Sequence, residues 1–185
     1  DLLTNIEMDT GLEFRGLDES HKKTLTISGG GTYTLTLNEK GIYAFQSNLT
    51  FQDLTLNLYA REHTYENSAG ATANLISNSD LHLKRVTCTI SPVGNCGSGM
   101  FLYQKTNLYL DDSEVTVDTV NGSMVNGIYA DNSEYPGSNR EVILKNSRLK
   151  ATGCSHAGLM LDPIDMTLKN SSEVEVTNNK EYGLS

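Results

Sequence analysis

The sequence contains no tryptophan, and its 185 residues include only three prolines, three cysteines and four phenylalanines. It has no run of 18 apolar residues, the length that a membrane-spanning helix needs, so we expect no membrane insertion. Basic residues are also scarce, with 14 Lys+Arg against 23 Asp+Glu and a net charge of −9. Because nucleic-acid binders draw much of their affinity from basic contacts to phosphate, this balance argues against a nucleic-acid partner.

The three cysteines, Cys88, Cys96 and Cys154, leave at least one thiol unpaired. A Cys88–Cys96 disulfide across a loop is one interpretation, but a buried Cys88 with two incidental thiols is favoured, because unpaired cysteine is commonly a core residue. No cysteines or histidines have the spacing of a zinc site. The first residues lack the basic and apolar segments of a signal peptide, which suggests a mature product or a piece of a longer chain.

A repeat of three parts runs through most of the chain. The first part is a short apolar run that begins at residues 41, 73, 99, 127, 158 and 183, so the repeats are 25–32 residues long. The second part alternates as apolar-x-apolar-x-x, as in residues 81–85 (LHLKR), and the third alternates again, as in residues 86–90 (VTCTI). Alternation with a period of two is the pattern of a strand with one buried face.

Three short strands per repeat predict an all-β fold, a parallel β-helix (solenoid) with about five coils. Residues at one position of the third part should stack in an inward column: Leu56, Cys88, Val115, Leu149 and Val174. Residues at the junction of the second and third parts should form a column of tight turns: Asp53, Arg85, Asp112, Asn146 and Asn170. A β-sandwich with coincidental spacing is the alternative.

The repeat also predicts how the chain is organised. Residues 1–23 fit it poorly and are expected to form an N-terminal cap or an incomplete first coil, whereas residues 24–185 form the solenoid. Because the chain stops at the start of a new repeat, we expect the parent chain to continue. Loops 59–70 and 131–140 vary most, so a ligand is expected either on this loop patch or on a lateral sheet.

The repeats resemble the pectate-lyase-like right-handed parallel β-helix superfamily over residues 24–185. The resemblance is carried by residues 127–130 (GIYA), 142–150 (VILKNSRLK) and 158–161 (GLML). It implies a right-handed solenoid and a secreted or cell-surface protein whose partner is a polysaccharide or a cell-surface glycan. The superfamily includes adhesins and polysaccharide enzymes, so fold alone does not decide between them. We expect a non-enzymatic, adhesin-like or carbohydrate-binding module. The alternative is a polysaccharide lyase or glycoside hydrolase acting on an acidic polysaccharide.

A resemblance to polygalacturonases implies a catalytic set of an aspartate pair and an Arg-x-Lys, for which the candidates are Asp111, Asp112, Arg148 and Lys150. The Asn-Thr-Asp and Gly-His-Gly motifs of that family are absent, and Asp112 belongs to the turn column, so the two carboxylates should not share a face. A structural interpretation is favoured. In it, Arg148 lies between Glu114 and Glu173 on neighbouring strands, and Lys150 lies beside Glu175.

Two acidic segments suggest a metal site. Their candidate ligands are Asp131, Glu134, Asp162 and Asp165, because clustered carboxylate oxygens suit calcium. Neither segment has the spacing of an EF-hand or of a calcium-binding nonapeptide repeat. Solvated loop carboxylates are therefore the favoured interpretation, with calcium as a candidate cofactor.

Overall fold

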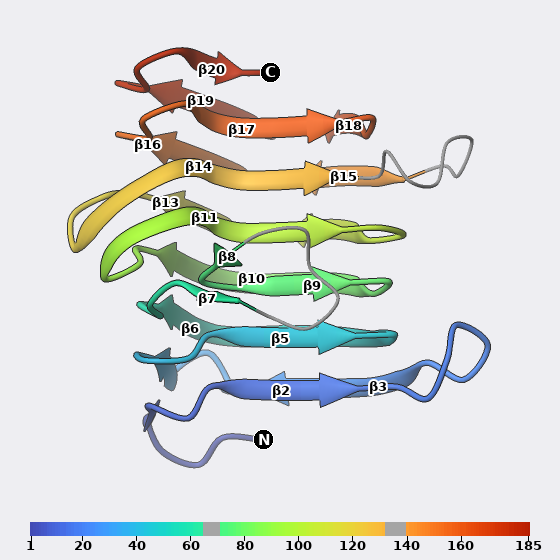
Figure 1. Ribbon diagram of the computed structural model, residues 1–185. Coiled ribbons are helices and arrows are strands. Elements are labelled where there is room, and N and C mark those ends of the chain that lie inside the picture. Colours follow the sequence, from blue (N-terminus) through green and yellow to red (C-terminus); the bar gives the residue numbers. More distant parts are fainter. Residues whose placement is uncertain (65–70, 132–139) are drawn as a thin grey trace.

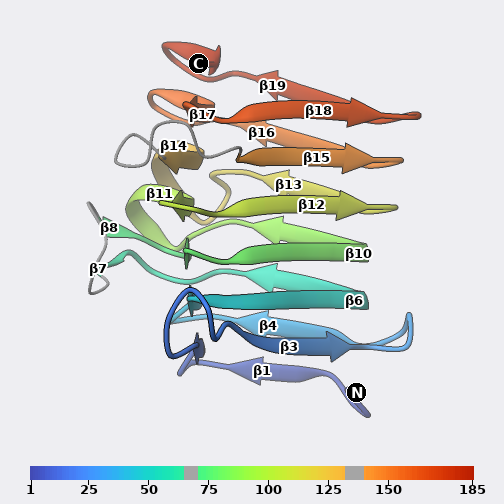
Figure 2. The ribbon, with the colours of Figure 1, turned by 90° about the vertical axis from the view of Figure 1, so that its right-hand side faces the viewer.

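The computed structural model describes residues 1–64, 71–131 and 140–185, and over these ranges the chain forms 20 β-strands and no helix. The chain winds as a right-handed parallel β-helix of about six turns (Figures 1 and 2). No helix among the described residues could cross a membrane. The predicted fold class is thus confirmed, with three short strands in each coil.

Three parallel sheets run along the solenoid. Sheet 1 comprises β3 (Lys23–Ser28), the first halves of β6 (Ser47–Leu58) and β10 (Asp80–Ile90), β12 (Asn107–Asp111), β15 (Glu141–Lys145) and β18 (Asp165–Lys169). Sheet 2 comprises β1 (Ile6–Met8), β4 (Thr34–Leu37), the second halves of β6 and β10, β13 (Glu114–Val117), β16 (Arg148–Thr152) and β19 (Glu173–Thr177).

Sheet 3 comprises β2 (Leu12–Arg15), β5 (Ile42–Phe45), β9 (Leu75–Ser77), β11 (Gly94–Tyr103), β14 (Gly122–Asp131), β17 (Ala157–Asp162) and β20 (Tyr182–Leu184). Two further strands, β7 (His63–Thr64) and β8 (Ala71–Thr72), form an antiparallel pair that joins sheet 3 through β8. All other strand pairs among the described residues are parallel.

The prediction of about five coils is too low by one. Residues 6–45 already form rungs, because β1 pairs with β4, β2 with β5 and β3 with β6. The repeat was hard to see there, since only 21 residues separate the stacked Leu35 and Leu56, a shorter step than in later coils. Residues 1–23 include β1 and β2, the first rungs of sheets 2 and 3.

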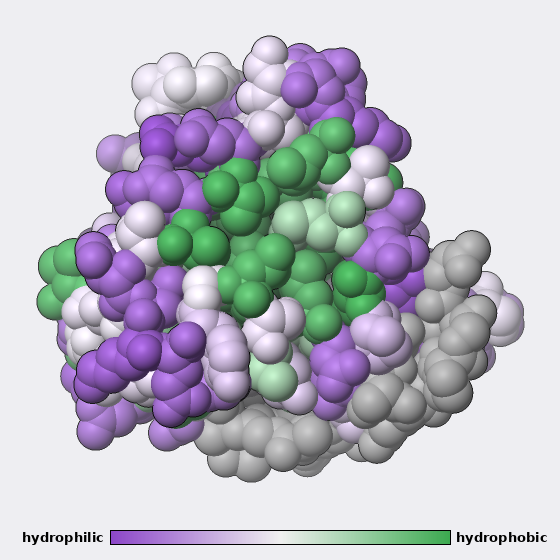
Figure 3. Space-filling model, turned by 90° about the horizontal axis from the view of Figure 1, so that it is seen from above, coloured by the Kyte–Doolittle hydropathy of each residue, from purple (hydrophilic) through white to green (hydrophobic). Residues whose placement is uncertain are grey.

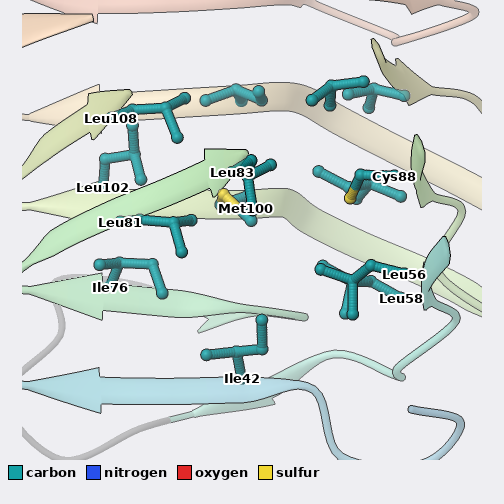
Figure 4. Packing of buried hydrophobic residues seen from close by; sticks show 14 of the residues in the cluster. Ile42, Leu56, Leu58, Ile76, Leu81, Leu83, Cys88, Met100, Leu102 and Leu108 are labelled. Carbon is teal, nitrogen blue, oxygen red and sulfur yellow. The ribbon is translucent and has the colours of Figure 1, made fainter. Parts of the chain in front are cut away.

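The predicted inward column is confirmed. The register places Cys88 between Leu56 and Val115, and Leu149 between Val115 and Val174. All but Val174 are at most 2% exposed; Val174 belongs to the last coil and is half-buried. Figure 4 shows Cys88 above Leu56, with side chains from the other sheets filling the rest of the interior.

The predicted turn column is also confirmed. All five residues have left-handed backbone conformations, with φ between 48° and 58°. Asparagine and aspartate adopt left-handed backbone conformations readily, whereas arginine, the residue at position 85, does not. Its guanidinium binds both carboxylate oxygens of Asp53, one coil below, at 2.5 and 2.8 Å. A second left-handed column, which the sequence did not predict, connects sheet 3 to sheet 1 at Gln46, Asn78 and Gln104.

Polar side chains inside the solenoid connect the backbones of successive coils. The Ser113 hydroxyl accepts a hydrogen bond from the Val86 amide, and the Ser147 hydroxyl accepts one from the Ser113 amide, each at 3.0 Å. The fully buried Asn74 accepts from the Ile42 amide at 2.9 Å and donates to the Gly99 carbonyl at 2.8 Å. Such pairing removes the penalty of burying unsatisfied polar groups.

All three cysteines are free and buried, and Cys88 and Cys96 form no disulfide. The expected burial of Cys88 is confirmed, and Cys96 and Cys154, expected to be incidental thiols, are buried as well. Burial raises the pKa of the Cys88 thiol to about 12 and those of Cys96 and Cys154 to about 11. The thiols therefore stay protonated at neutral pH and serve as small core side chains.

The C-terminal end of the solenoid exposes part of its interior. Seen from above, apolar side chains gather at the centre of this end within a hydrophilic rim (Figure 3). Leu168 is 49% exposed and Leu184 is 55% exposed, whereas equivalent positions in the middle coils are buried. The strands β18, β19 and β20 have no further rung above them among the described residues.

Candidate ligand-binding groove

Sheet 1 presents three columns of outward side chains, because alternate residues of each strand face the solvent. The near column, at the beginning of the strands, contains Thr24, Asn48, Asp80, Asn107, Glu141 and Asp165. The middle column contains Thr26, Thr50, His82, Tyr109, Ile143 and Thr167. The far column, next to the turns, contains Ser28, Gln52, Lys84, Asp111, Lys145 and Lys169. Figure 2 views this sheet.

A groove of about 270 Å³ lies between the middle and far columns, over β10, β12, β15 and β18. Its lining consists of His82, Lys84, Tyr109, Leu110, Asp111, Ile143, Lys145 and Lys169. At its floor the rings of His82 and Tyr109 stack, with centroids 4.5 Å apart and planes 19° apart. The two strands are adjacent rungs, so the register of the solenoid itself brings these rings together.

Both stacked rings are uncharged at neutral pH. Burial lowers the pKa of His82, and the positive charge of Lys84 lowers it further, against the opposing effect of Asp80. Burial also raises the pKa of Tyr109 to about 12, helped by the nearby carboxylates of Asp80 and Glu141. The Tyr109 hydroxyl donates a hydrogen bond to Glu141 at 3.3 Å, which orients the ring. The floor is therefore a flat, neutral, half-buried aromatic surface.

The near column is largely occupied by contacts within the protein. The side-chain amide of Asn107 donates to Asp80 at 2.7 Å, while its carbonyl oxygen accepts from the Glu141 amide at 3.1 Å. Glu141 also accepts from Tyr109. These contacts hold Tyr109 in place from the side of the near column, whereas the far column forms the open side of the groove.

The structure does not bring all four candidate catalytic residues together in one place. Asp111 faces out of sheet 1 and pairs with Lys145 at 3.0 Å. Lys150 faces out of sheet 2 and pairs with Glu175 at 3.2 Å. Asp112 and Arg148 do line one hollow of about 460 Å³, at the corner between sheets 1 and 2, together with Arg85, Glu114 and Glu173. There Asp112 accepts a hydrogen bond from Asn146 at 3.0 Å.

The register expected around Arg148 is present, but its contacts differ from the expected ladder. Arg148 lies beside Glu114 on one side and Glu173 on the other. Its guanidinium leans toward β19, donates to Glu175 at 2.5 Å and approaches Glu173 at 3.6 Å. Glu114 interacts with it only at longer range. The hydrogen bond to Glu175 raises the pKa of Arg148, so this side chain holds its proton more firmly than a free arginine.

We expect Arg148→Ala to lower the thermal midpoint only slightly, because its ion pairs are exposed to water. Salt should reduce the difference further. In double-mutant cycles followed by urea unfolding, Arg148 should couple measurably to Glu175 and much less to Glu114. Equal coupling to both glutamates, or coupling to neither, contradicts the observed geometry.

The candidate metal ligands do not form one cluster in the described part of the chain. Asp131 and Asp162 lie on adjacent rungs of sheet 3, and Asp131 accepts a hydrogen bond from Tyr129 at 3.2 Å. Asp165 lies on sheet 1, and Glu134 lies outside the described residues. No group of three or more His, Cys, Asp or Glu side chains suited to a metal ion occurs within residues 1–64, 71–131 and 140–185. Calcium stays a prediction.

Sequence reasoning missed the groove, although the repeat contained its signal. The second part of each repeat alternates inward and outward residues, and the outward ones form columns across the coils. Aligned by coil, the same position reads Thr50, His82, Tyr109, Ile143 and Thr167. The predicted loop patch falls largely on residues 65–70 and 132–139, outside the described part of the chain.

No family model, curated protein or solved structure matches the chain. The parallel β-solenoid therefore stands on the geometry of the chain itself, and membership of the pectate-lyase-like superfamily stays a prediction.

Proposed function

We propose that this chain is a non-enzymatic, extracellular glycan-binding module of the adhesin-like kind, and that it holds its ligand in the groove of sheet 1. The observation that carries the proposal is the stacked His82–Tyr109 pair in the floor of that groove. Neutral aromatic faces suit the apolar C–H face of a sugar ring, and the flanking polar side chains suit its hydroxyl groups.

The proposed site also has a suitable shape and rigidity. The groove runs across four rungs of one sheet and is open to solvent, which allows an extended polymer to lie in it. Its side chains stand on strands rather than on loops, so little ordering is needed when a ligand binds. Membership of the pectate-lyase-like superfamily and a secreted or cell-surface location are part of the same proposal.

An enzyme that cleaves an acidic polysaccharide is the second candidate. It is favoured only by the corner hollow, which Asp112 and Arg148 both line. Both are already engaged, Asp112 with Asn146 and Arg148 with Glu175, and Arg148 keeps its proton. Lyases and hydrolases both need a group that accepts a proton from the substrate or from water. The groove proposal requires no such group.

The proposal is tested by screening neutral and acidic glycans for binding to the purified chain, with uronate and reducing-end release measured in parallel. We expect binding without cleavage. Tyr109→Ala should weaken binding about tenfold or more, because it removes most of the aromatic floor. Tyr182→Ala is the matched control, since it removes an exposed tyrosine from sheet 3 and leaves the groove intact.

Circular dichroism establishes that both variants remain folded. Binding that Tyr109→Ala leaves unchanged would move the site away from the groove. Cleavage by the wild type that Arg148→Ala abolishes would replace the proposal with the enzymatic one.

A further inference from the structure

The far column of the groove is basic, although the protein as a whole is acidic. Lys84, Lys145 and Lys169 occupy the same position on β10, β15 and β18 in a chain of net charge −9. Asp111 occupies that position on the intervening β12 and pairs with Lys145 at 3.0 Å. Neither Lys84 nor Lys169 forms an ion pair with a carboxylate among the described residues.

The order of charges along the column is therefore positive at Lys84, negative at Asp111 and positive at Lys145 and Lys169. Neighbouring rungs are about 4.8 Å apart, so Lys84 and Lys145 lie about 9–10 Å apart along the solenoid axis. One rung is close to the length of one sugar unit in an extended glycan. Two rungs therefore span a disaccharide.

A lysine ammonium is a mobile point charge that suits a carboxylate or sulfate without fixed geometry. Sugar rings that lie over His82 and Tyr109 place their substituents at the far column, since the groove lies between these two columns. An acid group beside Lys84 and another beside Lys145 are each favourable. An acid group on the intervening sugar faces the Asp111 carboxylate, and two negative charges side by side repel each other.

From this charge order, and resting on the proposed glycan-binding function, we infer that the groove selects a glycan with an acid group on alternate sugars. The polymer lies along the solenoid axis over β10, β12 and β15, with its acid groups at Lys84 and Lys145. Asp111 is the residue that disfavours a polymer with an acid group on every sugar. Lysines supply the whole positive charge of this site, so binding needs no metal ion.

The test compares three polymers of matched length by isothermal titration calorimetry in EDTA. They are hyaluronan, in which uronate alternates with a neutral sugar, polygalacturonate, with an acid on every sugar, and carboxyl-reduced hyaluronan, which is neutral. We expect hyaluronan to bind most tightly. Lys84→Gln and Lys145→Gln should each weaken its binding about 2–5-fold, whereas Lys40→Gln, at the corner between sheets 2 and 3, should not.

Asp111→Asn is the decisive variant. It should raise the affinity for polygalacturonate more than that for hyaluronan and so reduce the preference between them. If polygalacturonate binds as well as hyaluronan to the wild type, or if Asp111→Asn leaves their ratio unchanged, the alternation is overturned. If the neutral polymer binds equally well, the inference fails while the proposed function stands. If no glycan of the wider screen binds, the proposed function fails with it.

Discussion

Leu149→Asp should unfold the coils around β16 and cost the protein about 4 kcal/mol or more of unfolding free energy. Leu149 is 1% exposed and lies in the inward column between Val115 and Val174. A carboxylate there would be surrounded by apolar side chains from all three sheets. It would either be buried as a charge without a partner or take up a proton at a large cost, and both outcomes favour the unfolded state.

The measurement is urea unfolding followed by circular dichroism, with hydrogen exchange to locate the lost structure. Because each coil contacts mainly its neighbours, exchange should rise first in β13, β16 and β19. Thr116→Asp is the control, since it places the same carboxylate on the outer face of β13 beside Lys150. A Leu149→Asp protein as stable as the Thr116→Asp protein would contradict the inward orientation of this column.

The second large effect is expected for Asn74→Leu. The Asn74 side chain is fully buried and connects three coils, since it accepts from the Ile42 amide and donates to the Gly99 carbonyl. Leucine has the same side-chain branching but can neither donate nor accept, so it leaves both backbone groups buried without a partner. Each such group costs about 1–3 kcal/mol, so we expect a loss of about 2–5 kcal/mol.

Asn179 offers a comparison in the last coil. It also accepts from a backbone amide, that of Cys154 at 3.0 Å, and donates to a backbone carbonyl, that of Ala151 at 3.4 Å, but both partners belong to the preceding coil. It lies near the open C-terminal end and is only half-buried, so water can replace its hydrogen bonds. Asn179→Leu should therefore cost clearly less than Asn74→Leu in urea unfolding. Equal losses of unfolding free energy in the two variants would mean that burial does not determine the cost of removing these hydrogen bonds.

The fold could be predicted from the sequence because its main determinants are local and repeated. Alternation in residues 81–90 (LHLKRVTCTI) identifies two strands with one buried face each, and its recurrence in later repeats defines the register of Cys88 on Leu56. The left-handed turn at Asn146 follows from residue type. The number of coils was underestimated by one because Leu35 stacks on Leu56 after a shorter step than the others.

The groove was harder to predict because it depends on relations between coils. Nothing within β10 or β12 alone indicates that His82 and Tyr109 will stack; that contact exists only once the 26 intervening residues have completed one turn. The direction in which a long side chain points likewise depends on which of several nearby partners it bonds. Arg148 had glutamates on both neighbouring strands and bonded with Glu175, two residues beyond the one directly beside it.

The left-handed turns have a consequence for how such a chain can change its length. Arg85 and Asp112 have the same backbone conformation at the same corner, with φ of 52° and 50°. A recombination event that joins these two sites deletes or duplicates one whole coil and leaves the register of all other coils intact. Such a deletion removes β12, and with it Tyr109 and Asp111, whereas a duplication adds a further aromatic rung. The length of the groove is therefore a quantity that evolution can change in single steps.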